Sequence, residues 1–217
     1  MSQWTPELRA QRVDAILSQA PVLPVLSIAN VDDAVPLARA LVDGGLPVLE
    51  VTLRTAVAVE AIARIAREVP GAVVGAGTIR TGAELAAVAD AGGVFAISPG
   101  ATEALYDAAQ AATIPWIPAI ATASELMRGL EHGHRRFKFF PAESSGGIGA
   151  LKGFAGPFAE ARFCPTGGID AAKAPGYFVQ PNVVTVGGSW MVPSDALASR
   201  DWPRIATLAR EAAALRG

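Results

Sequence analysis

The sequence predicts an α/β fold, and within that class a (β/α)8 TIM barrel, from two patterns and one absence. Short apolar runs alternate with alanine-rich helical stretches along the chain, and such an alternation requires a parallel sheet with helices packed against it. The runs recur at a spacing of roughly 25 residues, which suits closure of eight strands into a barrel. No Gly-x-Gly-x-x-Gly motif follows the first run, which disfavours the alternative, an open doubly wound sheet that binds a dinucleotide.

The strand candidates are short and apolar, and most are stopped by Gly, Pro or polar residues, as strands usually are. They cover residues 22–28, 46–52, 72–76, 94–98, 116–118, 136–140, 162–166 and 183–186.

Helices are predicted between the strands. One covers residues 32–43, with Asp32 as its candidate cap, and another covers 56–69, where apolar residues recur at helical spacing. Gly44-Gly45, Pro70-Gly71 and Gly92-Gly93 would end helices. An extra N-terminal helix over residues 7–19 would precede the first strand and cover the bottom of the barrel. Because no linker or change of composition divides the chain, residues 1–217 are expected to form a single domain.

Composition excludes several classes of protein. Apolar residues make up 51% of the 217 residues and charged residues 18%, which is typical of a globular chain. A net charge of −2 with scattered basic residues offers no nucleic-acid surface. No apolar run approaches the roughly 20 residues that cross a bilayer, and the first twelve residues lack an apolar signal-peptide core. We therefore expect a cytoplasmic protein without nucleic-acid or membrane partners.

The histidines and the cysteine predict no metal site and no disulfide. Cys164 is the only cysteine, and its neighbours suggest a small buried strand residue. His132 and His134 flank a glycine, but no further ligand lies near them in sequence, so a solvated loop is the better interpretation.

Lys138 is the most informative single residue. It lies among Phe137, Phe139 and Phe140 in a predicted strand, although lysine is normally solvated. Apolar surroundings disfavour an ammonium and favour the neutral amine, which is the nucleophile that Schiff-base catalysis needs. A lysine at a strand end, or one half of a buried ion pair, is the structural alternative.

Polar and glycine residues gather where the predicted strands end. In a barrel all carboxyl ends of the strands meet at one mouth, where the active site is built. Ordinary turns, caps and salt bridges would explain any one of these residues, but not their shared position. They are Glu50, Arg54, Gly77-Thr78, Ser98-Pro99-Gly100, Lys138, Thr166-Gly167-Gly168 and Gly187-Gly188-Ser189.

Two of these segments predict a phosphate site. Backbone N–H groups exposed by glycine next to a helix start bind anions, and the loops after strands seven and eight are where barrels often hold phosphate. The segments 166–168 and 187–189 fall in those two loops.

With these residues in place, the chain closely resembles the class I 2-keto-3-deoxy-6-phosphogluconate (KDPG) aldolases, a family that overlaps with the 4-hydroxy-2-oxoglutarate aldolases. The resemblance runs from about residue 20 to the C-terminus. It is carried by residues 49–55 (LEVTLRT), 74–78 (VGAGT), 95–100 (FAISPG), 137–143 (FKFFPAE), 162–169 (RFCPTGGI) and 186–190 (VGGSW).

The resemblance implies a trimeric (β/α)8 barrel that cleaves a phosphorylated 2-keto acid to pyruvate and glyceraldehyde 3-phosphate without a cofactor or metal. Lys138 would be the Schiff-base lysine and Glu50 the general acid/base, with Arg54 and Thr78 at the pyruvate carboxylate. Other residues of the mouth would bind the rest of the substrate, with the glycine loops at its phosphate. They are Pro99, Phe140, Thr166, Gly167, Gly168, Gly187, Gly188 and Ser189. Residues 117–122 (IPAIAT) depart slightly from the family pattern.

Two alternatives stay open at this point. An aldolase for the galactonate epimer needs nearly the same site, although Arg54 within Thr-Leu-Arg-Thr favours the gluconate type. A barrel that only binds a phosphorylated ligand is the non-enzymatic alternative. The intact set of Lys138, Glu50, Arg54 and Thr78 speaks against it.

Overall fold

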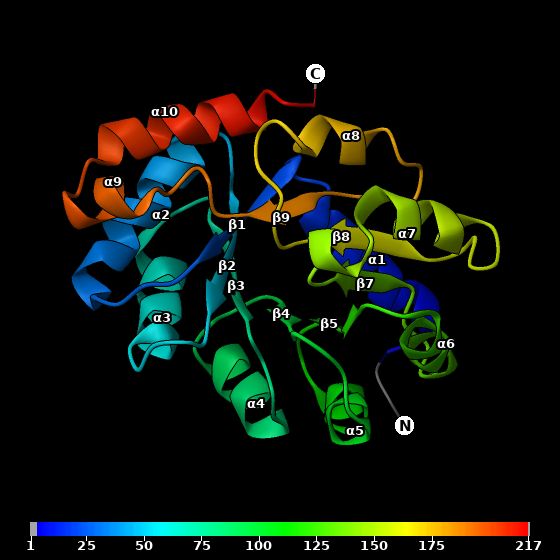
Figure 1. Cartoon of the computed structure of the whole chain (residues 1–217). Coiled ribbons are helices and arrows are strands. Elements are labelled where there is room, and N and C mark those ends of the chain that lie inside the picture. The colour runs from blue at the N-terminus through cyan, green and yellow to red at the C-terminus, as the bar shows by residue number, and fades with distance from the viewer. Residues whose placement is uncertain (1–3, 217) are drawn as a thin grey trace.

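A computed structural model describes residues 4–216 and shows an α/β fold whose parallel sheet is curled, with helices around its outside (Figure 1). The strands are β1 (Val22–Leu26), β2 (Val48–Thr52), β3 (Val73–Gly77), β4 (Ala96–Ile97), β5 (Trp116–Ile117), β6 (Ala119–Ile120), β7 (Arg136–Phe139), β8 (Arg162–Pro165) and β9 (Val186–Gly188). The α-helices are α1 (Pro6–Leu17), α2 (Ala34–Asp43), α3 (Ala58–Glu68), α4 (Gly82–Asp90), α5 (Glu103–Ala111), α6 (Ala123–Glu131), α7 (Gly147–Ala155), α8 (Ala174–Phe178), α9 (Ser194–Ala198) and α10 (Trp202–Ala213). Two short 3-10 helices are η1 (Val31–Asp33) and η2 (Glu143–Ser145).

The strands pair in parallel throughout, in the order β5-β4-β3-β2-β1-β9 and, separately, β6-β7-β8. Only Pro118 separates β5 from β6. Isolated parallel bridges, Phe163 with Val183 and Thr166 with Gly187, connect the β8 segment to the β9 segment. The carboxyl ends of the strands therefore lie on the same side of the curled sheet.

Several predicted elements are displaced or divided. The predicted strand over residues 116–118 ends one residue earlier, and a second strand, Ala119–Ile120, follows it, because Pro118 has no N–H to donate to a ladder. The last strand is Val186–Gly188, later than the predicted 183–186, and the predicted 94–98 strand shrinks to Ala96–Ile97. Asp32 does not cap the second helix. The side chain of Asn30 accepts from the Asp32 N–H, and a 3-10 turn leads into α2.

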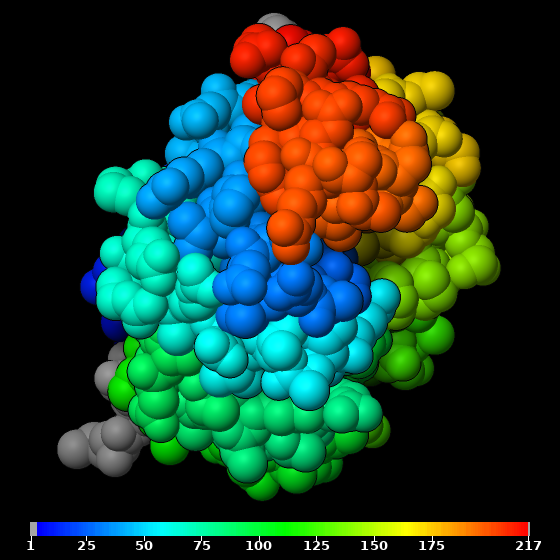
Figure 2. Space-filling model, turned by 90° about the vertical axis from the view of Figure 1, so that its left-hand side faces the viewer, coloured from blue at the N-terminus to red at the C-terminus, as the bar shows by residue number. Residues whose placement is uncertain are grey.

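Two apolar layers form the interior. The larger one lies between the sheet and the helices, and in it α10 packs on α2. At the surface, the red and orange C-terminal segment lies beside the blue segment that includes α2 (Figure 2). The smaller one lies inside the curl, where Val13 and Leu17 of α1 join Leu23, Phe95 and Cys164. Helix α1 thus contributes side chains to the inner layer. Among the helices of residues 4–216, none has the length and apolarity that a membrane span requires.

Candidate active site

Lys138 and Glu50 form a buried ion pair at the centre of the site. The Lys138 Nζ donates to Glu50 Oε1 at 2.7 Å, and the two residues are 5% and 0% exposed. The second carboxylate oxygen of Glu50, Oε2, is buried without a hydrogen-bond partner in residues 4–216. A buried carboxylate with one oxygen free beside an amine can hold and return a proton.

Strand alternation places this pair inside the curled sheet. Phe137 and Phe139 point into the layer under the helices, whereas Lys138 points inward. The Phe140 ring lies on the same side as Lys138, as alternation predicts, with Nζ 5.4 Å from the ring centroid. The surroundings of the amine are therefore not simply apolar. The ion pair, which the sequence left as an alternative, is present at the same lysine.

A glycine makes room for Glu50. A Cβ atom at Gly77 of β3 would lie 2.0 Å from Glu50 Oε1 and 2.7 Å from its Cδ. Glu50 and Gly75 are register partners on adjacent strands, and Gly77 lies two residues further along. Only glycine at this position lets the carboxylate reach Lys138 across the sheet.

An open pocket of about 170 Å³ lies over the lysine at the carboxyl ends of the strands. Most of the predicted site residues line it, together with Val25 and Ile169, which the sequence analysis did not select. The lining consists of Val25, Arg54, Lys138, Phe140, Thr166, Gly167, Gly168, Ile169, Gly187, Gly188 and Ser189. Ile169 directly follows the Thr-Gly-Gly segment, so its position next to that segment could have predicted it. Val25 carries no such signal.

Arg54 enters this pocket with its charge uncompensated. It follows β2, is exposed, and makes no side-chain ion pair or hydrogen bond within residues 4–216. A guanidinium in that position is free to bind a carboxylate with both of its N–H edges.

Thr78 and Pro99 lie at the same end of the sheet but outside the pocket lining. Thr78 follows Gly77 and has a φ of 64°, in the left-handed region that β-branched residues rarely adopt. Strain of this kind concentrates at functional sites. Pro99 is exposed after β4.

The glycines of the two loops have different structural reasons. A Cβ at Gly187 would lie 2.2 Å from Thr166 Oγ1, and one at Gly188 would lie 2.0 Å from the Trp190 ring. Both are therefore required by packing, whatever binds there. Gly167 and Gly168 instead have φ values of 105° and 78°. Within residues 4–216, the N–H groups of Gly168, Ile169 and Ser189 donate no hydrogen bond, so they can bind an anion.

Cys164 and the histidines lie outside this chemistry. Burial raises the pKa of the Cys164 thiol to about 12. The solvated loop predicted for the histidine pair is wrong for His134, which is 1% exposed, because its ring packs between Tyr106 and Trp116. Within the described range 4–216, no cluster of His, Cys, Asp and Glu has the arrangement of a metal site.

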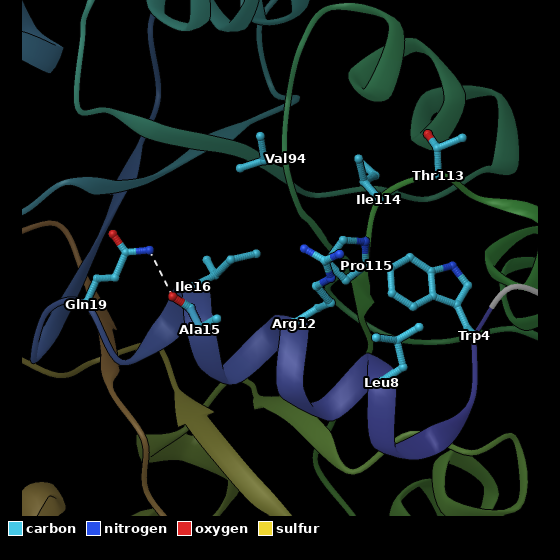
Figure 3. A pocket seen from close by; sticks show the side chains of 10 residues that line it. All are labelled: Trp4, Leu8, Arg12, Ala15, Ile16, Gln19, Val94, Thr113, Ile114 and Pro115. Atoms are coloured by element: carbon cyan, nitrogen blue, oxygen red, sulfur yellow. Dashed lines mark hydrogen bonds between the residues drawn. The ribbon is translucent and has the colours of Figure 1, made fainter.

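A larger pocket of about 520 Å³ lies at the opposite ends of the strands, where α1 faces the segments that precede β4 and β5 (Figure 3). Its lining is mostly apolar, and Arg12 is its one charged residue. None of the residues predicted for the site lies there, and no pair of groups in it can transfer a proton. Chemistry therefore favours the smaller pocket over the larger one.

Comparison with known proteins gives concordant matches. The family model described as KDPG and KHG aldolase matches residues 13–208. The KHG/KDPG aldolase of Escherichia coli (strain K12) is 55% identical over 199 residues, which is 92% of this chain and 93% of that protein.

Two solved structures are also similar over most of the chain. A KDPG aldolase from Legionella pneumophila, with pyruvate captured as a covalent carbinolamine, superposes with a TM-score of 0.90 at 46% identity, covering 93% of this chain and 98% of that one. The aldolase of Zymomonas mobilis ZM4, with 3-phosphoglycerate, gives a TM-score of 0.89 at 49% identity, covering 94% and 95%.

Proposed function

Because the chain belongs to the KDPG and KHG aldolase family, we propose that it cleaves 2-keto-3-deoxy-6-phosphogluconate to pyruvate and glyceraldehyde 3-phosphate through a Schiff base on Lys138. It also acts on 4-hydroxy-2-oxoglutarate. The observation that carries the proposal is the 2.7 Å contact between the Lys138 amine and the Glu50 carboxylate under an open pocket. The covalent carbinolamine of pyruvate in the Legionella pneumophila aldolase supports the same chemistry.

The ion pair supplies the nucleophile. Transfer of one proton from Lys138 Nζ to Glu50 leaves a neutral amine and a neutral acid 2.7 Å apart. The amine attacks the C2 ketone of the substrate to form a carbinolamine. Glu50 gives the proton it took from Lys138 to the departing hydroxyl, which leaves as water, so that an iminium forms and Glu50 is a carboxylate again.

Cleavage then uses the iminium as the electron sink. A base, assigned to Glu50, removes the proton of the C4 hydroxyl, the C3–C4 bond breaks, and its electrons move into the iminium to form an enamine. The aldehyde leaves, and Glu50 returns the proton to C3, giving the imine of pyruvate. Water hydrolyses this imine, which releases pyruvate and restores Lys138. Glu50 Oε2, which has no hydrogen-bond partner among residues 4–216, is the oxygen assigned to these transfers.

Substrate binding is assigned to the two sides of the pocket. Arg54 and Thr78 hold the carboxylate of the keto acid, since Arg54 has a free guanidinium in the pocket. The N–H groups of Gly168, Ile169 and Ser189 hold the phosphate. The 3-phosphoglycerate in the Zymomonas mobilis structure supports a phosphate end in this family.

The remaining architectural proposals rest on connectivity and resemblance. The bridges between the β8 and β9 segments support closure into a (β/α)8 barrel formed by one domain, with α1 across the amino-terminal ends of its strands. We assign the chain a homotrimeric assembly and a cytoplasmic location by analogy with the family. Sedimentation equilibrium at several protein concentrations tests the assembly.

The first prediction tests the nucleophile. Borohydride reduction in the presence of pyruvate should attach pyruvate covalently to Lys138, because only an imine is reduced to a stable amine. Mass spectrometry of peptides from the treated protein identifies the modified lysine. Lys152 and Lys173, the other two lysines, are internal controls, and an adduct on either of them in place of Lys138 would refute the mechanism.

Substrate identity requires a separate measurement. Cleavage rates on the gluconate and galactonate epimers, each phosphorylated at C6, decide between the two aldolase activities. We expect the gluconate epimer to be the better substrate. A chain that binds the phosphorylated acids but neither cleaves them nor traps pyruvate would be a binding protein only.

A further inference from the structure

Three side chains that do not line the pocket meet at the Gly167-Gly168 turn. Lys173 Nζ donates to the Gly168 carbonyl at 2.8 Å and contacts Glu143 Oε2 at 2.9 Å. The Tyr177 hydroxyl donates to Glu143 Oε1. Glu143 follows β7, whereas Lys173 and Tyr177 lie at the start of α8 and within it. No role in binding or chemistry has been assigned above to these three residues, which we call the turn support.

The turn support completes a row of held carbonyls. The Ala142 N–H donates to the Thr166 carbonyl at 2.8 Å, and the Glu143 N–H donates to the Gly167 carbonyl at 3.1 Å. Lys173 holds the next carbonyl, that of Gly168. The carbonyl groups of Thr166, Gly167 and Gly168 thus each accept a hydrogen bond. The first two donors are backbone N–H groups, and the third is the Lys173 side chain.

Fixing these carbonyls fixes the N–H groups that follow them. In a trans peptide the carbonyl oxygen and the next N–H point in opposite directions, and the only cis peptide within residues 4–216 is Phe140-Pro141. The Gly168 N–H therefore points away from the Gly167 carbonyl, and the Ile169 N–H points away from the Gly168 carbonyl. Both residues line the pocket, and neither N–H donates a hydrogen bond within the described residues.

The Gly168 carbonyl needs this restraint because Gly167 and Gly168 precede it in the chain. Glycine occupies both signs of φ with similar ease, so without Lys173 the Gly168 carbonyl oxygen is less restrained and can turn toward the pocket. A carbonyl oxygen there repels a phosphate, whereas an N–H attracts one. A Cβ at Gly168 would lie 2.8 Å from Glu143 Cγ, so the turn is packed directly against its support.

The charges within the turn support are maintained near neutral pH. Hydrogen bonds from Tyr177 and then Lys173 lower the pKa of Glu143, and the hydrogen bond to Glu143 raises the pKa of Lys173. Tyr177 is fully buried, and its hydroxyl holds the Glu143 carboxylate by a hydrogen bond. An exposed ion pair contributes little to stability, so the geometry is better explained by orientation of the turn than by stabilisation of the fold.

We propose that Lys173, held by Glu143 and Tyr177, is a positioning residue that orients the Gly168–Ile169 peptide for binding the phosphate of the substrate. It sets the preference for phosphorylated over unphosphorylated 2-keto acids without touching the reacting atoms. This inference rests on the proposed function. It adds that part of the specificity resides in side chains outside the pocket.

The experiment compares Lys173→Met with Lys152→Met, which removes the same charge from an exposed lysine on α7. Loss of a charged hydrogen bond of this kind corresponds to about a tenfold effect. We expect Lys173→Met to raise KM for the phosphorylated acid, and the dissociation constant of inorganic phosphate measured by calorimetry, by about that factor. Turnover of 4-hydroxy-2-oxoglutarate and pyruvate trapping should change less than twofold, and Lys173→Arg should restore part of the loss. Lys152→Met should change none of these values.

Glu143→Gln separates positioning from direct contact. If Lys173 bound the phosphate itself, removing the negative charge of Glu143 would free the ammonium and tighten phosphate binding. The positioning role requires the opposite, a weaker binding of phosphate, because the carboxylate holds Lys173 on the Gly168 carbonyl. Tighter binding in Glu143→Gln, or an equal loss on both substrates in Lys173→Met, would overturn the proposal. Failure of the unmodified chain to cleave either acid would overturn the proposed function alone, since phosphate calorimetry still tests the turn support.

Discussion

At the scale of residues, the site depends on two ionisable groups that need each other. Lys138 and Glu50 are both buried, so each would be an uncompensated charge without the other. Removing one partner of a buried pair typically costs about 3–5 kcal/mol, whereas replacing both with neutral groups of similar size is often tolerated. The pair is therefore both the proposed source of reactivity and a local weakness in stability.

Lys138→Met should abolish cleavage and pyruvate trapping and should also destabilise the fold, by a few kcal/mol. Removal of a lone lysine from an apolar site need not destabilise the fold, whereas removal of Lys138 leaves the Glu50 carboxylate buried without its partner. Adding Glu50→Gln to Lys138→Met removes the stranded carboxylate and should recover part of the loss. Urea denaturation of both variants measures the difference, and equal midpoints would mean that the stranded Glu50 carboxylate does not destabilise the Lys138→Met protein.

Glu50→Gln alone separates binding from proton transfer. The amide keeps the shape of the side chain but cannot titrate, so pyruvate trapping on Lys138 should persist. Exchange of the pyruvate methyl protons should slow by about 10²–10⁴-fold, the usual contribution of a general acid–base group. Proton NMR in D₂O measures the exchange. If it proceeded at the rate of the unmodified protein, Glu50 would be excluded as the base.

The sequence predicted these residues to different degrees. Lys138 was visible because a lysine among aromatics is chemically unusual, whatever the fold. Its contact with Glu50 was not visible, because the two residues are 88 positions apart and meet only across the curled sheet. The burial of His134 was missed for the same reason, since Tyr106 and Trp116, which enclose its ring, lie on other elements.

At the scale of elements, short strands and glycine turns position the site. The strand–helix alternation was predictable, because hydrophobic periodicity and glycine stops are local. The ends of the strands were not, since β4, β5 and β6 contain two residues each and their limits depend on pairing with neighbours. The split at Pro118 could have been anticipated from the missing N–H alone.

Gly77→Ala tests whether β3 determines the position of Glu50. The new methyl group would lie 2.0 Å from Glu50 Oε1, so the carboxylate must move away from Lys138. A displacement of about 1 Å at a reacting group can cost on the order of 10² in rate, and we expect kcat to fall by at least that factor.

Gly100→Ala is the matched control at the same end of the sheet. A Cβ at Gly100 meets no atom within 4 Å, so activity should be unchanged. Steady-state kinetics on the phosphorylated acid and circular dichroism of both variants complete the comparison. A fully active Gly77→Ala would mean that Glu50 reaches its partner by another path and that the strand does not determine its position.

At the scale of the whole molecule, a second buried cluster joins consecutive units of the fold. Tyr106 of α5, Trp116 of β5 and His132 after α6 surround the region of His134, which precedes β7. Arg9 of α1 donates to the His132 carbonyl at 3.2 Å. The cluster thus links the N-terminal helix to the middle of the sheet.

His134 makes the stability of this cluster depend on pH. Burial, and secondly the charges of Arg9 and His132, lower the pKa of His134 to about 2, and its ring nitrogens have no hydrogen-bond partner in residues 4–216. In the unfolded chain a histidine has a pKa of about 6.5. Between these values the unfolded state binds more protons than the folded state, so stability falls as the pH falls below about 6.5.

The expected slope is about 1.4 kcal/mol per pH unit below about pH 6.5, or about 2 kcal/mol between pH 6.5 and pH 5. A carboxylate whose pKa is lowered on folding, such as Glu84 or Glu143, changes stability mainly below its unfolded pKa of about 4.3, so these groups contribute little to the slope above pH 5. Urea denaturation at pH 5, 6 and 7, at one protein concentration, measures it. His134→Phe keeps an aromatic ring between Tyr106 and Trp116 and should flatten the dependence of stability on pH. His132→Gln keeps the buried imidazole of His134 and should leave that dependence unchanged. A His134→Phe protein with the unmodified slope would show that the proton uptake on unfolding belongs to other groups.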